Sequence, residues 1–159
     1  MVSSTLTKAI KVVHSSSEEE TLGIARTLGR QLKAGDWVAL VGDLGAGKTL
    51  FVKGIAEGLE CRDTPRSPTF ALVQTYPSKA GSRRPSLRHV DLYRLDRREI
   101  TSLEWEELFE GDGVTAVEWA DKARPLWPAA AVEVRLAHDG ENRRTIEFFG
   151  GGRARELAQ

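Results

Sequence analysis

Apolar residues in the first third of the chain recur with the periods of a strand, a helix, a second strand and a second helix. Residues 9–13 predict a short strand, and the run Trp-Val-Ala-Leu-Val at 37–41 predicts a buried one. The segment after each strand carries apolar residues at helical spacing. These residues are Leu22, Ala25, Leu28 and Leu32 in the first helix, and Val52, Ile55, Ala56 and Leu59 in the second.

Polar residues mark the ends of the first predicted helix. Ser17 and Glu20 have the spacing of a capping box, and the acidic run at 18–20 lies where the helix dipole favours negative charge. Gly35 is positioned to end the helix. The acidic residues are therefore interpreted as caps and solvated surface, with a ligand role as the alternative.

Short segments with turn residues between them dominate the remainder of the chain. In order they predict a strand at 70–76, a surface loop at 77–85, a strand at 87–92, a helix at 97–109, a strand at 114–117 and a terminal hairpin of 131–138 and 145–149. The tail from residue 150 is expected to be frayed. The whole pattern predicts one α/β domain over residues 1–159, with a mainly parallel central sheet, flanking helices and a C-terminal β-hairpin.

Composition narrows the class of protein. The chain has 159 residues, a length typical of one domain, and its 23 Lys plus Arg balance its 23 Asp plus Glu. No global charge therefore indicates a nucleic-acid or membrane partner. Cys61 is the single cysteine and is interpreted as a small packing residue rather than as an activated thiol. Because neither a signal-peptide core nor a run of 18 apolar residues is present, a cytoplasmic protein is expected.

The segment 42–49 carries the clearest chemistry. It reads Gly-Asp-Leu-Gly-Ala-Gly-Lys-Thr, a complete G-x-x-x-x-G-K-[ST] phosphate loop between a predicted strand and a predicted helix. Glycines let backbone N–H groups curl around an anion, and the helix N-terminus adds its positive dipole end. Lys48 is expected to reach the β- and γ-phosphates, and Thr49 to bind Mg²⁺. A glycine-rich turn without a ligand needs neither residue, so the segment predicts nucleoside triphosphate binding.

Two carboxylates at strand ends complete the predicted site. Asp91 lies near the end of the strand at 87–92, and Glu118 follows the strand at 114–117. Ligands of open α/β sheets bind at the carboxyl ends of the strands, so both are candidates to hold Mg²⁺ or to orient the attacking water. The alternative is a capping or solvated carboxylate. Residues 67–70, Ser-Pro-Thr-Phe, are a candidate mobile loop, with a plain turn as the alternative.

Together these segments resemble the TsaE family of small bacterial ATPases. The resemblance rests on residues 42–49, 67–70, 89–95 (His-Val-Asp-Leu-Tyr-Arg-Leu) and 118–119 (Glu-Trp), in that order. Val90 stands where the family pattern has Phe. The resemblance implies a P-loop protein that is needed for threonylcarbamoyl modification of adenosine 37 in tRNAs reading codons that begin with A. It also implies that the protein binds a TsaB–TsaD pair and that its ATP hydrolysis supports the turnover of that pair.

The same resemblance implies individual residue roles. Nucleotide-binding positions would be Gly42, Asp43, Leu44, Gly45, Ala46, Gly47, Lys48, Thr49 and Leu50, with Ser17 and Glu18 near the base and Trp119 beside the site. The ligands would be ATP and Mg²⁺, with the metal held by Thr49 and Glu118. Asp91 would occupy the acidic strand-end position, and its role is interchangeable with that of Glu118. Lys48, Asp91 and Glu118 are thus the candidates for catalysis.

Other protein classes also use a phosphate loop. A small-molecule kinase needs arginines that clamp the transferred phosphoryl group, and the pairs at 83–84 and 97–98 are candidates, with solvated charges as the alternative. A regulatory GTP-binding switch would carry an Asn-Lys-x-Asp segment, which this sequence does not have. No motif supplies an arginine finger, so slow hydrolysis without partners is expected. The basic stretch at 79–88 is interpreted as a solvated loop, and any tRNA contact as indirect.

Overall fold

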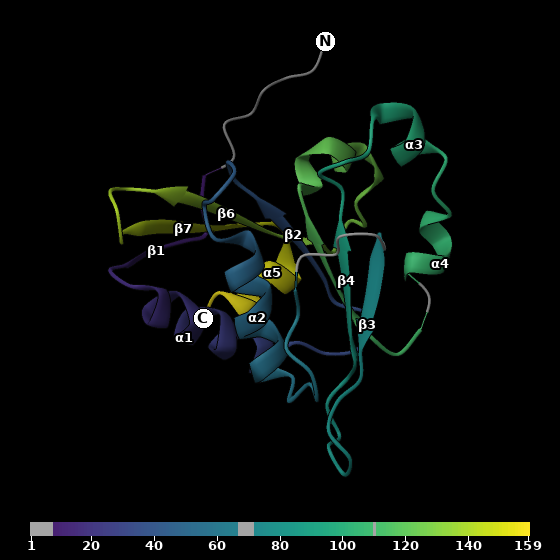
Figure 1. The fold of residues 1–159 in the computed structure, drawn as a ribbon, viewed down its shortest axis with the longest axis horizontal. Coiled ribbons are helices and arrows are strands. Elements are labelled where there is room, and N and C mark those ends of the chain that lie inside the picture. The colour runs from purple at the N-terminus through teal and green to yellow at the C-terminus, as the bar shows by residue number, and fades with distance from the viewer. Residues whose placement is uncertain (1–7, 67–71, 110) are drawn as a thin grey trace.

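The computed structural model describes residues 8–66, 72–109 and 111–159 of the chain (Figure 1). Its strands form one seven-stranded sheet in the order β1-β7-β6-β2-β5-β4-β3. The strands are β1 (Lys11–Ser15), β2 (Trp37–Val41), β3 (Val73–Tyr76), β4 (Leu87–Asp91), β5 (Val114–Glu118), β6 (Val132–His138) and β7 (Arg144–Phe149). The helices are α1 (Glu18–Gln31), α2 (Lys48–Gly58), α3 (Arg97–Thr101), α4 (Trp105–Phe109), the 3₁₀ helix η1 (Ala120–Leu126) and α5 (Gly152–Leu157).

The centre of the sheet is parallel and its margins are antiparallel. Strands β6, β2, β5 and β4 run parallel, whereas β3 on one margin and β7 and β1 on the other run antiparallel to their neighbours. This arrangement confirms the predicted α/β fold, including the terminal hairpin of β6 and β7. It also explains why β2 carries no polar residue, because a strand between parallel neighbours is covered on both faces.

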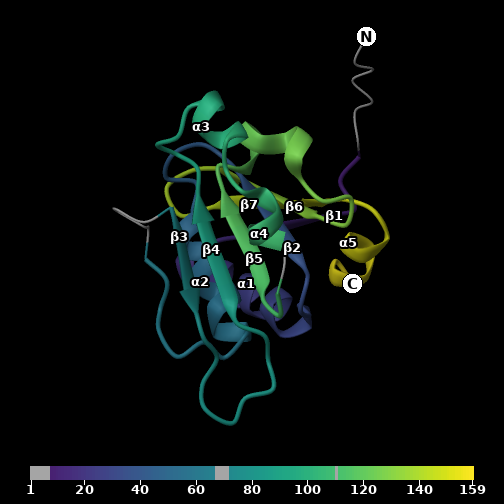
Figure 2. The same ribbon diagram turned by 90° about the vertical axis from the view of Figure 1, so that its right-hand side faces the viewer.

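Helices cover both faces of the sheet, as Figures 1 and 2 show. Helices α1, α2 and α5 share a core with Val38 and Leu40 of β2, whereas α3, α4 and η1 share one with Trp37 and Ala39. Successive strand residues point to opposite faces, so a single apolar run serves both cores. Helices α1 and α2 lie close together at Gly54, where an added Cβ would lie 2.4 Å from the Cβ of Ala25.

The start of α1 follows the prediction, but its end does not. Ser17 is the N-cap, and its Oγ accepts a hydrogen bond of 3.1 Å from the backbone N–H of Glu20. The Glu20 carboxylate in turn accepts one of 2.7 Å from the N–H of Ser16. The helix ends at Gln31, before Gly35, which lies in the turn to β2 with a φ of 90°. The prediction that Gly35 ends the helix is wrong, because its left-handed backbone is needed in that turn.

The predicted helix at 97–109 is interrupted. Helix α3 begins with a capping box between Asp96 and Glu99 and ends at Thr101. Its C-cap is Ser102, whose hydroxyl donates to the carbonyl of Glu99 over 2.9 Å. Helix α4 then begins at Trp105, whose indole N–H donates to the carbonyl of Ile100 over 2.7 Å. The break allows both Ile100 and Trp105 to be buried, which overrides the helical periodicity across this stretch.

The C-terminal tail is a helix and not frayed. Ala154 and Leu157 of α5 are buried in the same core as α1 and α2. Arg153 donates from Nε and NH2 to the carboxylate of Asp36, over 2.9 and 2.7 Å. These hydrogen bonds to the Asp36 carboxylate raise the pKa of Arg153 above its ordinary value. The prediction of a frayed tail is wrong because this ion pair and two apolar residues together attach a helix too short to be stable alone.

Smaller differences concern strand limits and segments outside the described residues. Strand β1 covers Lys11–Ser15 rather than residues 9–13. The candidate loop at 67–70 and the first residues of the predicted strand at 70–76 fall in the range 67–71, which lies outside the described residues, and β3 covers Val73–Tyr76. In the described ranges, no helix has both the length and the apolar character required to span a bilayer.

Candidate nucleotide-binding site

The predicted phosphate loop joins β2 to α2 at the carboxyl end of the parallel strands. Gly45 and Gly47 have left-handed backbone conformations, with φ values of 80° and 103°. Residues other than glycine rarely adopt this conformation. Helix α2 begins at Lys48, so its first backbone N–H groups have no helical acceptor. The loop therefore combines backbone donors with a helix dipole, which is the chemistry that a polyphosphate requires.

Lys48 lies within this loop and is 4% exposed. Its Nζ donates to the carbonyl oxygens of Gly42 and Asp43, over 2.5 and 2.8 Å. Burial lowers the pKa of Lys48, and four carboxylates act in the opposite direction: Glu118, Asp121, Asp43 and Asp91. The ammonium group is thus surrounded by acceptors that an incoming phosphate would replace or join. Asp121 was not singled out by any sequence motif.

Trp119 lies over the ammonium group of Lys48, with 4.0 Å between Nζ and the ring centroid. Its φ of 57° is left-handed, an unusual conformation for a bulky residue. The ring also packs against Tyr93, with 4.9 Å between the two centroids. A strained backbone that brings an aromatic ring over the loop lysine is typical of a functional site. Trp119 thus lies beside Lys48, and its contact with a nucleotide stays a prediction.

Thr49 and Glu118 meet although they lie 69 positions apart in the sequence. The hydroxyl of Thr49 donates to Oε1 of Glu118 over 2.8 Å, and Glu118 is 3% exposed. A hydroxyl and a carboxylate are oxygen ligands of the kind that Mg²⁺ takes together with phosphate oxygens and water. In the part of the chain that the structure describes, no group of three or more His, Cys, Asp and Glu side chains forms a metal cage. Because Mg²⁺ takes few protein ligands and completes its shell with phosphate and water oxygens, this hydroxyl and carboxylate fit Mg²⁺ bound together with a nucleotide.

His89 is a member of the site that the sequence analysis did not single out. It is fully buried, and its Nε2 lies 2.5 Å from Oε2 of Glu118. Strand alternation puts His89 and Asp91 on one face of β4, and Asp91 is the register partner of Glu118 in β5. The signal available in the sequence was a histidine two residues before a strand-end acid. Val90 between them is fully buried in the core on the opposite face, so the departure from the family pattern affects packing.

Asp91 shares this strand-end edge but makes a different contact. Its Oδ1 accepts a hydrogen bond of 3.0 Å from the backbone N–H of Tyr93. Lys122 of η1 supports the same turn by donating to three carbonyl groups over 2.8 to 3.2 Å, those of Leu92, Tyr93 and Leu95. The turn after β4 is therefore fixed beside Trp119, and Asp91 remains partly exposed at the end of its strand.

Ser17 and Glu18 lie at the start of α1. The Oγ of Ser17 caps the N–H of Glu20, and its carbonyl accepts from Thr21 and from the hydroxyl of Ser15 at the end of β1. Glu18 is exposed in the first turn. The capping interpretation of Ser17 is confirmed, whereas contact of these residues with a nucleotide base stays a prediction.

Several known proteins are similar to this chain in sequence. The family model described as "Threonylcarbamoyl adenosine biosynthesis protein TsaE" matches residues 15–146. Proteins named tRNA threonylcarbamoyladenosine biosynthesis protein TsaE are similar to this chain. The one from Nostoc sp. is 38% identical over 84% of this chain and 82% of its own length. The one from Bacillus subtilis is 37% identical over 87% of this chain and 85% of its own length. The one from Aquifex aeolicus is 35% identical over 88% of this chain and 96% of its own length.

A solved structure supports the same relationship. The crystal structure of YdiB from Bacillus subtilis matches with a TM-score of 0.76 and 32% identity. The match covers 98% of this chain and 94% of that one, so it includes the sheet, the phosphate loop and the terminal helix alike. From its sequence, its fold and these relatives, the chain belongs to the TsaE family of threonylcarbamoyl adenosine biosynthesis proteins.

Proposed function

We propose that this protein binds ATP with Mg²⁺ and hydrolyses the ATP in support of threonylcarbamoyl modification of tRNA adenosine 37, together with a TsaB–TsaD complex. The observation that carries the proposal is the convergence of Lys48 with the hydrogen-bonded pair of Thr49 and Glu118 at one phosphate loop. The names of the relatives, which are tRNA threonylcarbamoyladenosine biosynthesis proteins, support the pathway.

The chemistry assigned to the site uses this chain's own groups. The loop N–H groups and Lys48 would stabilise negative charge as it develops on the phosphate oxygens. Thr49 and Glu118 would hold Mg²⁺, which supplies charge neutralisation to the β- and γ-phosphates when it is bound. We assign the orientation of the attacking water to Asp91, because it ends β4 beside Glu118 and is partly exposed. Water would then attack the γ-phosphate in line.

The contacts of Arg84 argue against its use as the phosphoryl clamp that a kinase would need. Arg84 donates to the carbonyl of Arg30 over 2.8 Å and pairs with Glu60 at 3.5 Å. Glu60 follows the C-terminal end of α2, whereas the phosphate loop precedes its N-terminal end. A helix of this length separates the two ends by about 16 Å. Arg84 is thus engaged away from the loop, at a position unsuited to clamping a transferred phosphoryl group.

Three measurements test the proposal. Calorimetry with ATP and Mg²⁺ is expected to show binding, and GTP is expected to compete weakly. Phosphate release is expected to be slow for the isolated protein and faster when a TsaB–TsaD complex is added. An absence of ATP binding would refute the proposal, and a strong preference for guanine would point to a regulatory switch instead. Transfer of phosphate to a small acceptor in place of water would identify a kinase.

A further inference from the structure

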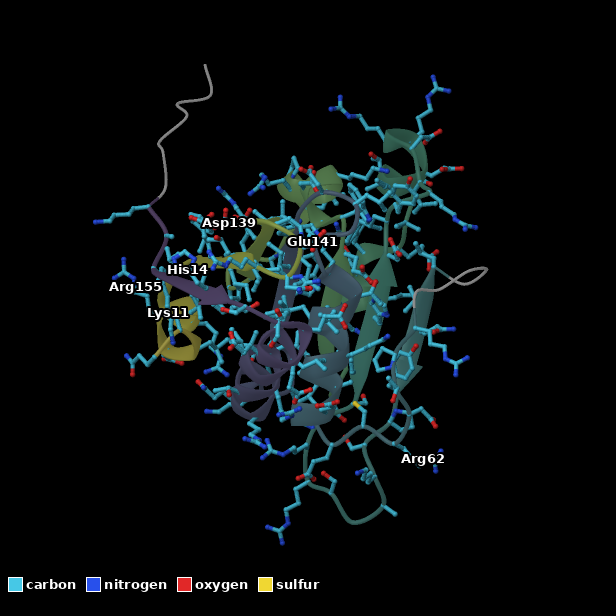
Figure 3. All side chains as sticks on the ribbon, turned by 60° about the vertical axis from the view of Figure 1, so that its left-hand side comes forward. Lys11, His14, Arg62, Asp139, Glu141 and Arg155 are labelled. Carbon is cyan, nitrogen blue, oxygen red and sulfur yellow. The ribbon has the colours of Figure 1, made fainter. Side chains whose placement is uncertain are left out.

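Two side chains of the β6–β7 hairpin donate hydrogen bonds to consecutive carbonyl groups of the phosphate loop. Nε2 of His138 donates to the carbonyl of Gly45, and Nε of Arg144 donates to that of Ala46 over 3.2 Å. His138 and Arg144 are cross-strand partners at the end of the hairpin, so their side chains leave the same face of the sheet. Figure 3 labels Asp139 and Glu141 on the turn that joins the two strands.

The loop packs closely on this hairpin at two of its glycines. A Cβ added to Gly47 would lie 2.9 Å from Nε of Arg144. A Cβ added to Gly42 would lie 2.5 Å from the carbonyl oxygen of Leu136 in β6. Contact with the hairpin backbone therefore requires glycine at position 42. At position 47 a side chain would both displace Arg144 and strain a backbone with a φ of 103°.

Fixing a carbonyl group also fixes the N–H group of the next residue. The peptide unit is planar and trans, so its N–H points opposite to its C=O. The bond from His138 to Gly45 thus orients the N–H of Ala46, which donates to the carbonyl of Asp43 over 3.0 Å. The bond from Arg144 to Ala46 likewise directs the N–H of Gly47 away from the hairpin. The hairpin therefore sets the direction of a main-chain donor in the loop before any ligand binds.

Arg144 brings a second property to this contact. The residue is 7% exposed, and its NH1 is buried without a hydrogen-bond partner among the described residues. Over the same described ranges, no carboxylate forms an ion pair with Arg144. A buried donor without an acceptor destabilises the folded protein. An unpaired guanidinium beside a loop built for polyphosphate adds to the positive field that the ligand meets.

We propose that the β6–β7 hairpin braces the phosphate loop, with His138 and Arg144 as positioning residues that preorganise its main chain for the phosphates. The inference rests on the proposed nucleotide binding and deepens it. Because the brace acts on phosphate-binding groups, its contribution is independent of the base. It thus applies equally to ATP and to inorganic tripolyphosphate.

The test compares the full-length protein with Arg144→Met, His138→Ala and the control Arg143→Met, which removes an exposed arginine from the adjacent position. Calorimetry with ATP and with tripolyphosphate is expected to show affinity about tenfold weaker in Arg144→Met, because binding must then supply the free energy that orders the loop. A smaller loss is expected in His138→Ala and none in Arg143→Met. His138 is exposed, so its variant tests the brace even if Arg144→Met does not fold.

Each other outcome overturns a defined part of the inference. If His138→Ala and Arg144→Met both fold and both bind ATP and tripolyphosphate with unchanged affinity, the brace is refuted while nucleotide binding stands. A loss for ATP without a loss for tripolyphosphate would assign Arg144 to the nucleoside and also refute the brace. Absence of binding by the unmodified protein would refute the proposed function, and the brace with it.

Discussion

Nε2 of His89 lies 2.5 Å from Oε2 of Glu118, and this buried contact fixes the carboxylate that Thr49 also engages. Each carboxylate oxygen of Glu118 has its own donor, one from β4 and one from α2. A carboxylate oxygen accepts hydrogen bonds, so the two donors hold the Glu118 carboxylate in one orientation. The orientation of the proposed Mg²⁺ ligand thus depends on two elements that the sequence separates widely.

Replacing His89 is expected to weaken Mg²⁺-dependent nucleotide binding. In His89→Ala the Glu118 carboxylate loses one of its two donors, and loss of an outer-shell partner typically costs 10–100-fold in metal affinity. Calorimetry should therefore show weaker ATP binding with Mg²⁺ and little change in excess chelator. His89→Gln retains an N–H donor, so its affinity for ATP with Mg²⁺ should lie between those of His89→Ala and the unmodified protein. Equal losses with and without Mg²⁺ would show that His89 only supports packing.

Lys48→Ala is expected to reduce ATP affinity by about tenfold or more, because a charged donor to the phosphates is lost. The fold should persist, since alanine is the best helix former at the start of α2. Lys53→Ala in the same helix is the matched control, and its affinity should equal that of the unmodified protein. Calorimetry and thermal denaturation, measured together, separate these effects. Unchanged affinity in Lys48→Ala would contradict the assignment of this lysine to the phosphates.

Arg153→Met should destabilise the protein without affecting nucleotide binding. The substitution removes the charged hydrogen bonds to Asp36 that attach α5, and a roughly 3–10 °C fall in Tm is expected for a domain of this size. Arg155→Met, on the exposed side of the same helix (Figure 3), should leave Tm unchanged. Equal Tm values for the two variants would show that the ion pair contributes little to the attachment of α5.

Cys61 should resist thiol reagents in the folded protein. Burial raises the pKa of its thiol to about 11, and only the thiolate reacts. Labelling at pH 8 is expected to be about a hundredfold slower in the native state than in denaturant. The raised pKa also means that the folded state binds this proton more tightly than the unfolded state. Its contribution to stability is therefore present below pH 9.0 and is lost as the pH rises toward about 11.

Thermal denaturation checks the second part of this prediction. The Tm of the unmodified protein should fall more between pH 9 and pH 11 than that of Cys61→Ala. Fast labelling of the native protein at pH 8 would indicate an activated thiol, the alternative that the sequence left open.

The sequence by itself determined the phosphate loop and its flanking strand and helix, because the spacing of Gly42, Gly47, Lys48 and Thr49 and the neighbouring apolar runs are local signals. It also determined the Ser17 cap and the terminal hairpin for the same reason. Local spacing did not reveal the break between α3 and α4 or the docking of α5. Burial of Ile100 and Trp105 and the pairing of Arg153 with Asp36 decide those features.

Only the tertiary structure decided which residues surround the loop. Thr49 donates a hydrogen bond to Glu118, which lies 69 positions away in the sequence. Arg144 donates one to the carbonyl of Ala46, which lies 98 positions away. Parallel register between β4 and β5 brings His89 to Glu118, and antiparallel register between β6 and β7 aligns His138 with Arg144. These contacts follow from strand order and register, which arise from packing across the whole sheet and leave no signature in any short segment of the chain.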